Sequence, residues 1–112
     1  LAYMVCTKLG DCFPAFKLED CQQQFKSLTN IDEEIGLRKS RFATYQDVDD
    51  AERRNEIQPD WSAASPCSKE LHALSCADPA IGRAYQPGDA QPLDGVAAAL
   101  PVSCTGVFAK NP

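Results

Sequence analysis

Apolar residues recur every three or four positions along most of the first 76 residues, which is the spacing of one buried face of an α-helix. The pattern predicts a first helix over residues 1–12, which Pro14 stops, and a second over 17–28. The second helix is expected to bury an apolar face that consists of Leu18, Cys21, Phe25 and Leu28.

Two further signals predict a third and a fourth helix. Asn30 and Glu33 have the spacing of a capping box, so a helix is expected to begin at Ile31 and to direct inward Ile35, Arg38 and Phe42. Residues 45–57 are the most charged part of the chain, with acidic residues ahead of basic ones. That order favours a solvated helix, because the N-terminal end of a helix attracts negative charge.

Another helix is predicted up to Ser75. Its start is indicated by Ser65 as the N-cap, Pro66 as the first helical position and Cys67 in the first turn. Beyond it the composition shifts to Ala, Pro, Gly and Asp, so mostly loop is expected from about residue 77, with a short helix near 93–100. The expected fold is one all-α domain over residues 1–112. It is a small disulfide-linked bundle of four to five helices with a Pro- and Gly-rich, mostly irregular C-terminal region.

Six cysteines occur in the 112 residues, at Cys6, Cys12, Cys21, Cys67, Cys76 and Cys104. An even number at this density in a short chain predicts three disulfides and therefore an oxidising compartment, either extracellular or periplasmic. No two cysteines lie two to four residues apart and the chain has one histidine, so neither a zinc site nor a Cys-x-x-Cys redox motif is expected. No metal or cofactor is predicted.

Helix geometry restricts the cysteine pairings without selecting one. Residues nine apart in a single helix are separated by about 13.5 Å and residues six apart by about 9 Å, whereas bridged Cα atoms lie about 4.4–6.8 Å apart. Cys67 and Cys76 therefore cannot pair if one helix holds both, and the same argument excludes a bond between Cys6 and Cys12. Cys12 and Cys21 could close a corner, since a proline separates them. Bonds that join the N-terminal helices to the helix of Cys67 and to the C-terminal segment are favoured.

The charge balance is 11 basic against 16 acidic residues, a net charge of −5. This charge repels the phosphate backbone, so nucleic-acid binding is not expected. No apolar run approaches the roughly 18 residues that a membrane-spanning helix needs. The sequence opens at Leu1 rather than at a methionine, as after removal of a signal peptide or after trimming.

The candidates for chemistry are weak. The acidic run that starts at Asp47 does not match a calcium-binding EF-hand loop, because Glu52 stands where that loop needs glycine and Gln58 where it needs glutamate. His72 on a predicted helix is similar to the catalytic histidine of secreted phospholipases A2, but its neighbour is Ala73 rather than aspartate and no glycine-rich calcium loop precedes it. The protein is therefore not expected to be an enzyme.

Three aromatic residues are candidates for contact with a partner protein: Trp61, Tyr85 and Phe108. Trp61, the one tryptophan, could anchor a partner, because large aromatic side chains dominate binding hot spots. A core position under the neighbouring loop is the favoured interpretation, since indole surface is costly to leave in water. The same two interpretations apply to Tyr85 and Phe108.

Four cysteine contexts resemble those of a known group of proteins: CTKLGDC at 6–12, LEDC at 18–21, CSKELHALSCAD at 67–78 and LPVSCTGVF at 100–108. They are similar to the cysteine framework of small exported proteins and lipoproteins of myxobacteria and related bacteria. The resemblance implies a small helical, disulfide-linked domain, in a group whose function is generally uncharacterised. The sequence departs from the lipoprotein members in beginning at Leu1 with no lipid-bearing cysteine, so the resemblance does not extend to a membrane anchor.

Two functions remain open. The first is an exported, non-enzymatic binding or structural module that could be a subunit of a larger extracytoplasmic assembly, with Trp61, the Pro-rich region and the acidic helix as contact surfaces. It is favoured because no catalytic constellation can be assembled from the sequence. The alternative is a small secreted effector, either an enzyme inhibitor that presents a loop over 77–92 or a weak hydrolase with His72 beside a carboxylate.

Overall fold

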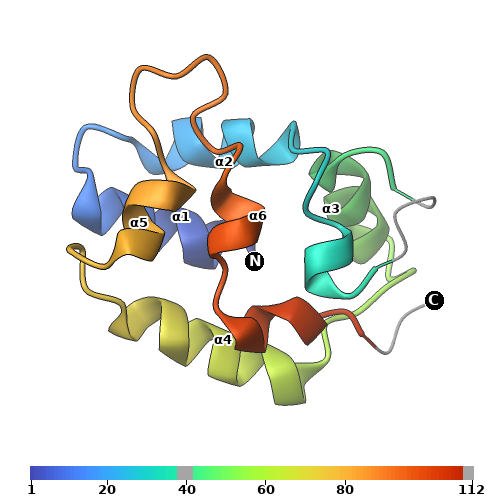
Figure 1. Ribbon diagram of the computed structural model, residues 1–112. Coiled ribbons are helices and arrows are strands. Elements are labelled where there is room, and N and C mark those ends of the chain that lie inside the picture. Colours follow the sequence, from blue (N-terminus) through green and yellow to red (C-terminus); the bar gives the residue numbers. More distant parts are fainter. Residues whose placement is uncertain (38–41, 110–112) are drawn as a thin grey trace.

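The computed structural model describes residues 1–37 and 42–109 (Figure 1). These residues form helices and connecting loops, without a β-strand. The α-helices and the two 3₁₀ helices (η) are, in chain order, α1 (Ala2–Cys12), α2 (Leu18–Lys26), η1 (Glu33–Ile35), α3 (Tyr45–Arg53), α4 (Trp61–Ala73), α5 (Pro79–Ala84), α6 (Val96–Ala99) and η2 (Val102–Gly106). The all-α prediction is confirmed, with α1 to α4 as the longer helices.

Three of the longer helices, α2, α3 and α4, lie around the other α-helices (Figure 1). Figure 1 shows α4 along one side of the molecule, α2 along the opposite side and α3 at one end, with α1, α5 and α6 between them. Helix α1 contacts both α2 and α4, while η2 packs on α4 and η1. Buried side chains from every one of these elements form one core, so the C-terminal segment is part of the fold rather than an appendage.

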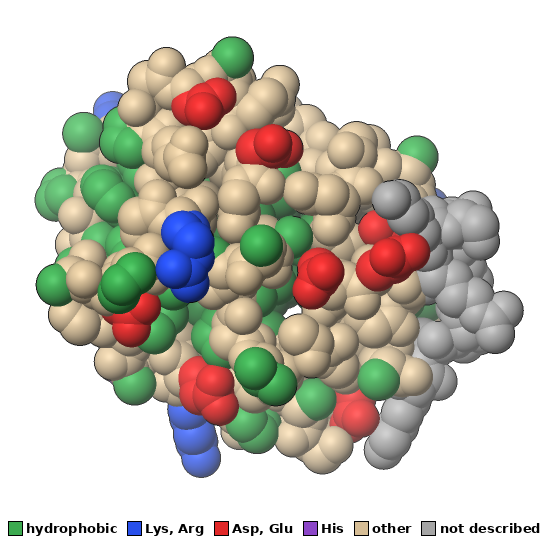
Figure 2. Space-filling model, viewed as in Figure 1, with side chains coloured by type: hydrophobic (Ala, Val, Ile, Leu, Met, Phe, Trp, Pro, Cys, Tyr) green, Lys and Arg blue, Asp and Glu red, His purple; other side chains and the backbone are tan. Residues whose placement is uncertain are grey.

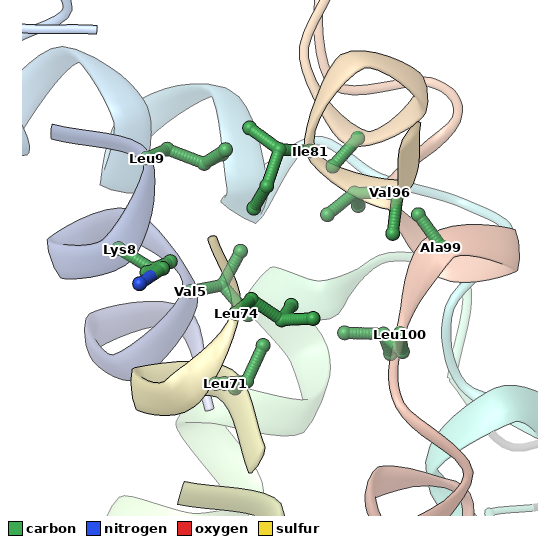
Figure 3. A pocket seen from close by; sticks show the side chains of 11 residues that line it. Val5, Lys8, Leu9, Leu71, Leu74, Ile81, Val96, Ala99 and Leu100 are labelled. Carbon is green, nitrogen blue, oxygen red and sulfur yellow. The ribbon is translucent and has the colours of Figure 1, made fainter. Parts of the chain in front are cut away.

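A cavity of about 20 Å³ lies within this core, between α1, α4, α5 and α6 (Figure 3). Its walls are almost entirely apolar and include Val5, Leu71, Ile81 and Val96. A water molecule needs at least about 10–15 Å³ and several polar partners, which this wall does not offer. The cavity is therefore a small packing defect and not a binding site.

All six cysteines are in disulfides, and the bonds are Cys6–Cys21, Cys12–Cys76 and Cys67–Cys104. The predicted number of three is confirmed, and neither excluded pairing occurs. The first bond closes the corner between α1 and α2, the second ties the end of α1 to the loop after α4, and the third ties α4 to η2. Only Cys12–Cys76 is of the favoured kind, since it links an N-terminal helix to the segment that directly follows the helix of Cys67. Three disulfides indicate an oxidising compartment.

The helix predicted from Ile31 onward is wrong for the described residues 31–37, where the single turn of η1 forms instead. Gly36 ends this turn with a φ of 96°, and a Cβ at that position would lie 2.8 Å from the backbone nitrogen of Ala109. Asn30 does not cap a helix either, because its side-chain amide donates a hydrogen bond to the carbonyl oxygen of Asp94. Long-range contacts therefore override the local capping pattern.

The predicted inward faces are partly right. Ile35 and Phe42 are buried as expected, while Arg38 lies outside the described residues. Leu18, predicted to be buried, keeps 38% of its surface exposed. Its place at the first position of α2 explains this, because it precedes the point at which α2 meets the core.

Helix α4 starts earlier than predicted. Asp60 is the N-cap, its side chain accepting from the backbone N–H of Ser62, so Ser65 is not the cap and Pro66 lies inside the helix. The interior proline has no N–H to donate to the preceding turn. Helix α3 differs as well: it is amphipathic rather than simply solvated, since it buries Val48 and Ala51.

The region from 77 onward is more helical than predicted. Helix α5 occupies Pro79–Ala84, with Asp78 as its N-cap, and η2 follows the short helix α6. Proline at the first position of α5 is compatible with a helix because that position needs no N–H donor. The expected loop over 77–92 is consequently a loop only in its second half.

Candidate protein-binding site

Trp61 is the most exposed aromatic side chain among the described residues, with 72% of its surface accessible. The prediction that it lies in the core is wrong. It is the first residue of α4 and follows the N-cap Asp60, whose carboxylate accepts hydrogen bonds from the backbone N–H and the hydroxyl of Ser62. The backbone N–H of Asp60 donates to the carbonyl oxygen of Val107, so the start of α4 is fixed to the C-terminal segment.

The position of Trp61 on the helix makes its exposure informative. Ala64, Cys67 and Leu71 follow on the inner face of α4, and all three are buried. Trp61 lies at the edge of this face, where its indole is left exposed. The bond between Cys67 and Cys104 further restrains α4, so the backbone that carries Trp61 has little freedom to lose on binding.

An apolar groove of about 430 Å³ lies beside Trp61. Its lining comes from four parts of the chain: α1, the end of α3, the start of α4 and the segment after η2. The groove is lined by Leu1, Met4, Glu52, Pro59, Trp61, Ala64, Ser65, Ser68, Val107 and Phe108. The structure thus brings together two of the three regions predicted as contact surfaces, the tryptophan and the acidic helix, while the prolines of the Pro-rich region do not line this groove.

Glu52 is the one acidic residue in this groove. It is half-buried, and its carboxylate forms no ion pair within 4 Å among the described residues. Leu1 lines the same groove; burial lowers the pKa of its ammonium group, and the negative charge of Glu52 opposes that shift. The acidic neighbours on α3 differ, since Asp49 pairs with Arg53. The sequence identified the helix as acidic but gave no signal that this one carboxylate lies among apolar side chains.

A hydrogen bond fixes the start of α1 against α3 near this groove. The phenolic oxygen of Tyr45 accepts from the backbone N–H of Ala2 at 3.4 Å. Burial raises the pKa of the Tyr45 hydroxyl, the bond from Ala2 opposes this shift, and the charges of Glu52 and Asp49 reinforce it. Tyr45 is therefore neutral at every physiological pH.

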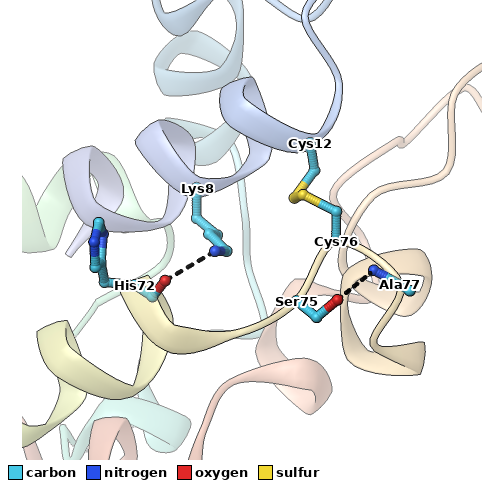
Figure 4. The surroundings of a disulfide bond; sticks show 6 residues. All are labelled: Lys8, Cys12, His72, Ser75, Cys76 and Ala77. Carbon is cyan, nitrogen blue, oxygen red and sulfur yellow. Dashed lines mark hydrogen bonds between the residues drawn. A yellow bond between two sulfur atoms is a disulfide. The ribbon is translucent and has the colours of Figure 1, made fainter.

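A second groove of about 160 Å³ continues along the seam between α1 and α4. It shares Met4 and Ser68 with the first groove and brings together Asp11, Ser68 and His72. The imidazole of His72 makes no hydrogen bond to any described residue, and the interaction that involves this residue is the one from Lys8 Nζ to its backbone oxygen, at 2.9 Å (Figure 4). A general base needs a partner that orients its ring, which this arrangement lacks.

The two other aromatic candidates are placed differently from Trp61. The ring of Tyr85 stacks on Phe16 at 4.1 Å between centroids and meets Phe13 edge-on at 4.8 Å, so it is half-buried in an aromatic cluster. Phe108 is only 1% exposed and forms part of the groove floor. It can support a partner contact from below but does not project toward one.

Charge is dispersed over the rest of the surface that Figure 2 shows, where acidic side chains alternate with polar and hydrophobic ones. Within residues 1–37 and 42–109 no three His, Cys, Asp or Glu side chains are grouped so as to hold a metal ion. None of the described helices has the length and hydrophobicity required to cross a membrane. Comparisons of the chain with models of protein families, with curated proteins and with solved structures found no match.

Proposed function

We propose that this chain is an exported, non-enzymatic module that binds another protein through the groove beside Trp61, as a subunit of a larger extracytoplasmic assembly. The observation that carries the proposal is the exposed indole at the rim of an apolar groove, on a helix end that is capped and disulfide-linked. We call the groove-lining residues together with Trp61 the Trp61 groove.

The physical argument is that binding hot spots combine a large aromatic anchor with a pocket that can be fully dried. Trp61 supplies the anchor, and Met4, Ala64 and Phe108 supply apolar walls. Because the disulfides and the N-cap hold these elements before binding, a partner need not order them. Secretion or periplasmic location is part of the proposal and is supported by the three disulfides.

The effector alternatives have less support. An inhibitor needs a rigid exposed loop, but α5 occupies the first half of the stretch over 77–92. A hydrolase is favoured only by the presence of Asp11, Ser68 and His72 in one groove. Without a hydrogen bond that orients the imidazole, that grouping is better explained as the solvated edge of the α1–α4 seam.

The test is affinity capture from the extracytoplasmic fraction of the source organism, with three oxidised baits: the wild-type chain, Trp61→Ala and Val102→Ala. Val102 is the matched control because it is 84% exposed and lies outside the Trp61 groove. We expect one protein to be retained in stoichiometric amount by wild-type and Val102→Ala baits and lost with Trp61→Ala. Repeated recovery of the bait alone, or equal capture by all three baits, contradicts the proposal.

A further inference from the structure

The Trp61 groove combines three chemical features: an exposed indole, apolar walls and a single half-buried carboxylate, that of Glu52. Each feature matches one part of an arginine side chain. We infer that the groove binds an arginine side chain presented by the partner protein, an inference that rests on the proposed function and specifies its ligand chemistry.

The aliphatic part of the arginine fits the apolar walls. Long basic side chains bury their methylene stems along apolar surface while the charged group stays at the edge. Met4, Ala64 and Phe108 provide such a surface, and the volume of about 430 Å³ leaves room for the stem and for an adjacent apolar residue of the partner. A purely apolar ligand would desolvate the Glu52 carboxylate without donating a hydrogen bond to it, which is unfavourable.

The guanidinium group matches the polar part of the groove. A guanidinium stacks on aromatic rings through a cation–π interaction that is strongest with tryptophan. It also pairs with a carboxylate through two parallel hydrogen bonds. Trp61 and Glu52 line the same groove, and the Glu52 carboxylate forms no ion pair within 4 Å among the described residues. Lysine has a compact ammonium group that cannot do both, so arginine is preferred.

Charge also argues against a second copy of this chain as the occupant. The chain has a net charge of −5, so two copies repel each other. Among the described arginines, Arg53 pairs with Asp49 and Arg54 with Glu56, whereas Arg83 is exposed and forms no ion pair. Binding of a second copy through Arg83 is one outcome that the test must separate. A partner with a basic segment is therefore the better match to the groove.

The test begins with selection of displayed random peptides on the oxidised wild-type chain, with the Trp61→Ala chain used to remove other binders. One selected peptide is then synthesised in four forms that carry arginine, lysine, citrulline or norleucine at the arginine position. Fluorescence anisotropy of the labelled peptides measures binding to wild-type, Glu52→Gln and Val102→Ala chains, and free L-arginine serves as a competitor. Circular dichroism verifies that the variants fold.

We expect arginine to be enriched in the selected peptides, and we expect its replacement by citrulline or lysine to weaken binding about tenfold. Glu52→Gln should weaken binding of the arginine peptide about five- to tenfold and leave binding of the norleucine peptide almost unchanged. Val102→Ala should bind both peptides as the wild-type chain does. Peptides selected without arginine, equal affinity of all four forms, or a Trp61-dependent dimer of the chain overturns this inference. Free L-arginine that competes as strongly as the peptide also overturns it, because a partner segment then adds nothing.

The two proposals fail separately. If affinity capture yields a Trp61-dependent partner while the four peptides bind equally, the protein-binding function stands and the arginine assignment is wrong. If no Trp61-dependent partner is captured, the function itself is refuted.

Discussion

The bond between Cys12 and Cys76 gives the clearest prediction about what stabilises the fold. Cys76 is exposed and Cys12 is half-exposed, whereas the other four cysteines are completely buried. Replacing the exposed pair by serine removes the cross-link without opening a cavity in the core. The double variant Cys12→Ser/Cys76→Ser therefore isolates the effect of the cross-link on the unfolded chain.

The size of the effect follows from the length of chain that the bond closes. The two cysteines are 64 residues apart in sequence, compared with 15 for Cys6–Cys21. The loop-entropy relation gives about 4 kcal/mol for the longer separation and about 3 kcal/mol for the shorter one. Since small domains are typically stable by about 5–15 kcal/mol, loss of this bond should remove a large part of the free energy of unfolding.

The assay is guanidinium chloride unfolding of the oxidised proteins, followed by far-ultraviolet circular dichroism without reductant. The control is Lys8→Met, which removes the neighbouring hydrogen bond from Lys8 to the backbone oxygen of His72 and keeps the disulfide (Figure 4). We expect this control to lose at most about 1.5 kcal/mol. If the double serine variant loses no more free energy of unfolding than Lys8→Met, the bond does not stabilise the fold as argued.

Three further predictions concern a packing contact, a buried hydroxyl and the absence of catalysis. A Cβ at Gly95 would collide with the carbonyl oxygen of Arg83, whereas one at Gly82 meets no atom within 4 Å. Thermal unfolding should therefore show that Gly95→Ala destabilises the protein by about 1–3 kcal/mol and that Gly82→Ala stabilises it by about 0.5–1 kcal/mol. Equal effects of the two substitutions would contradict the described packing. The pKa of the Tyr45 hydroxyl is raised in the folded state, so the stability that the neutral hydroxyl contributes is complete below the ordinary tyrosine pKa of 10.0 and is lost as the pH rises above it. Chemical unfolding across that pH range should show this alkaline loss of stability in wild-type and a smaller loss in Tyr45→Phe. Hydrolysis of p-nitrophenyl acetate should be equal for wild-type and His72→Ala, and a clear drop in the variant would support the hydrolase alternative.

The disulfide framework could be predicted in part because it depends on helix geometry and composition. The rise per residue alone excluded a bond between Cys6 and Cys12, and the structure has none. Which cysteines do pair depends on how α1, α2 and α4 pack, and this information is not local. Cys6 reaches Cys21 because both face the same buried contact between α1 and α2.

The site was harder to predict than the helices. The Asn30 and Glu33 spacing favoured a helix, but the tertiary contact of Asn30 with Asp94 and the close approach at Gly36 prevent it. Trp61 follows a residue that caps a helix, Asp60, and this local signal was present in the sequence. That the indole stays largely exposed depends on the position of the whole α4 helix, which the sequence pattern does not specify.

The central claim is that a partner protein contacts the chain at Trp61. The most direct measurement keeps Trp61 and places a photo-crosslinking amino acid at Ser65, an exposed residue that lines the Trp61 groove, in the living source organism. Position 102 is the control, and the adducts are compared after illumination. We expect one discrete adduct with a second protein from position 65 and none from position 102, whose side chain is 84% exposed. No adduct from position 65, or the same adducts from both positions, would contradict the claim.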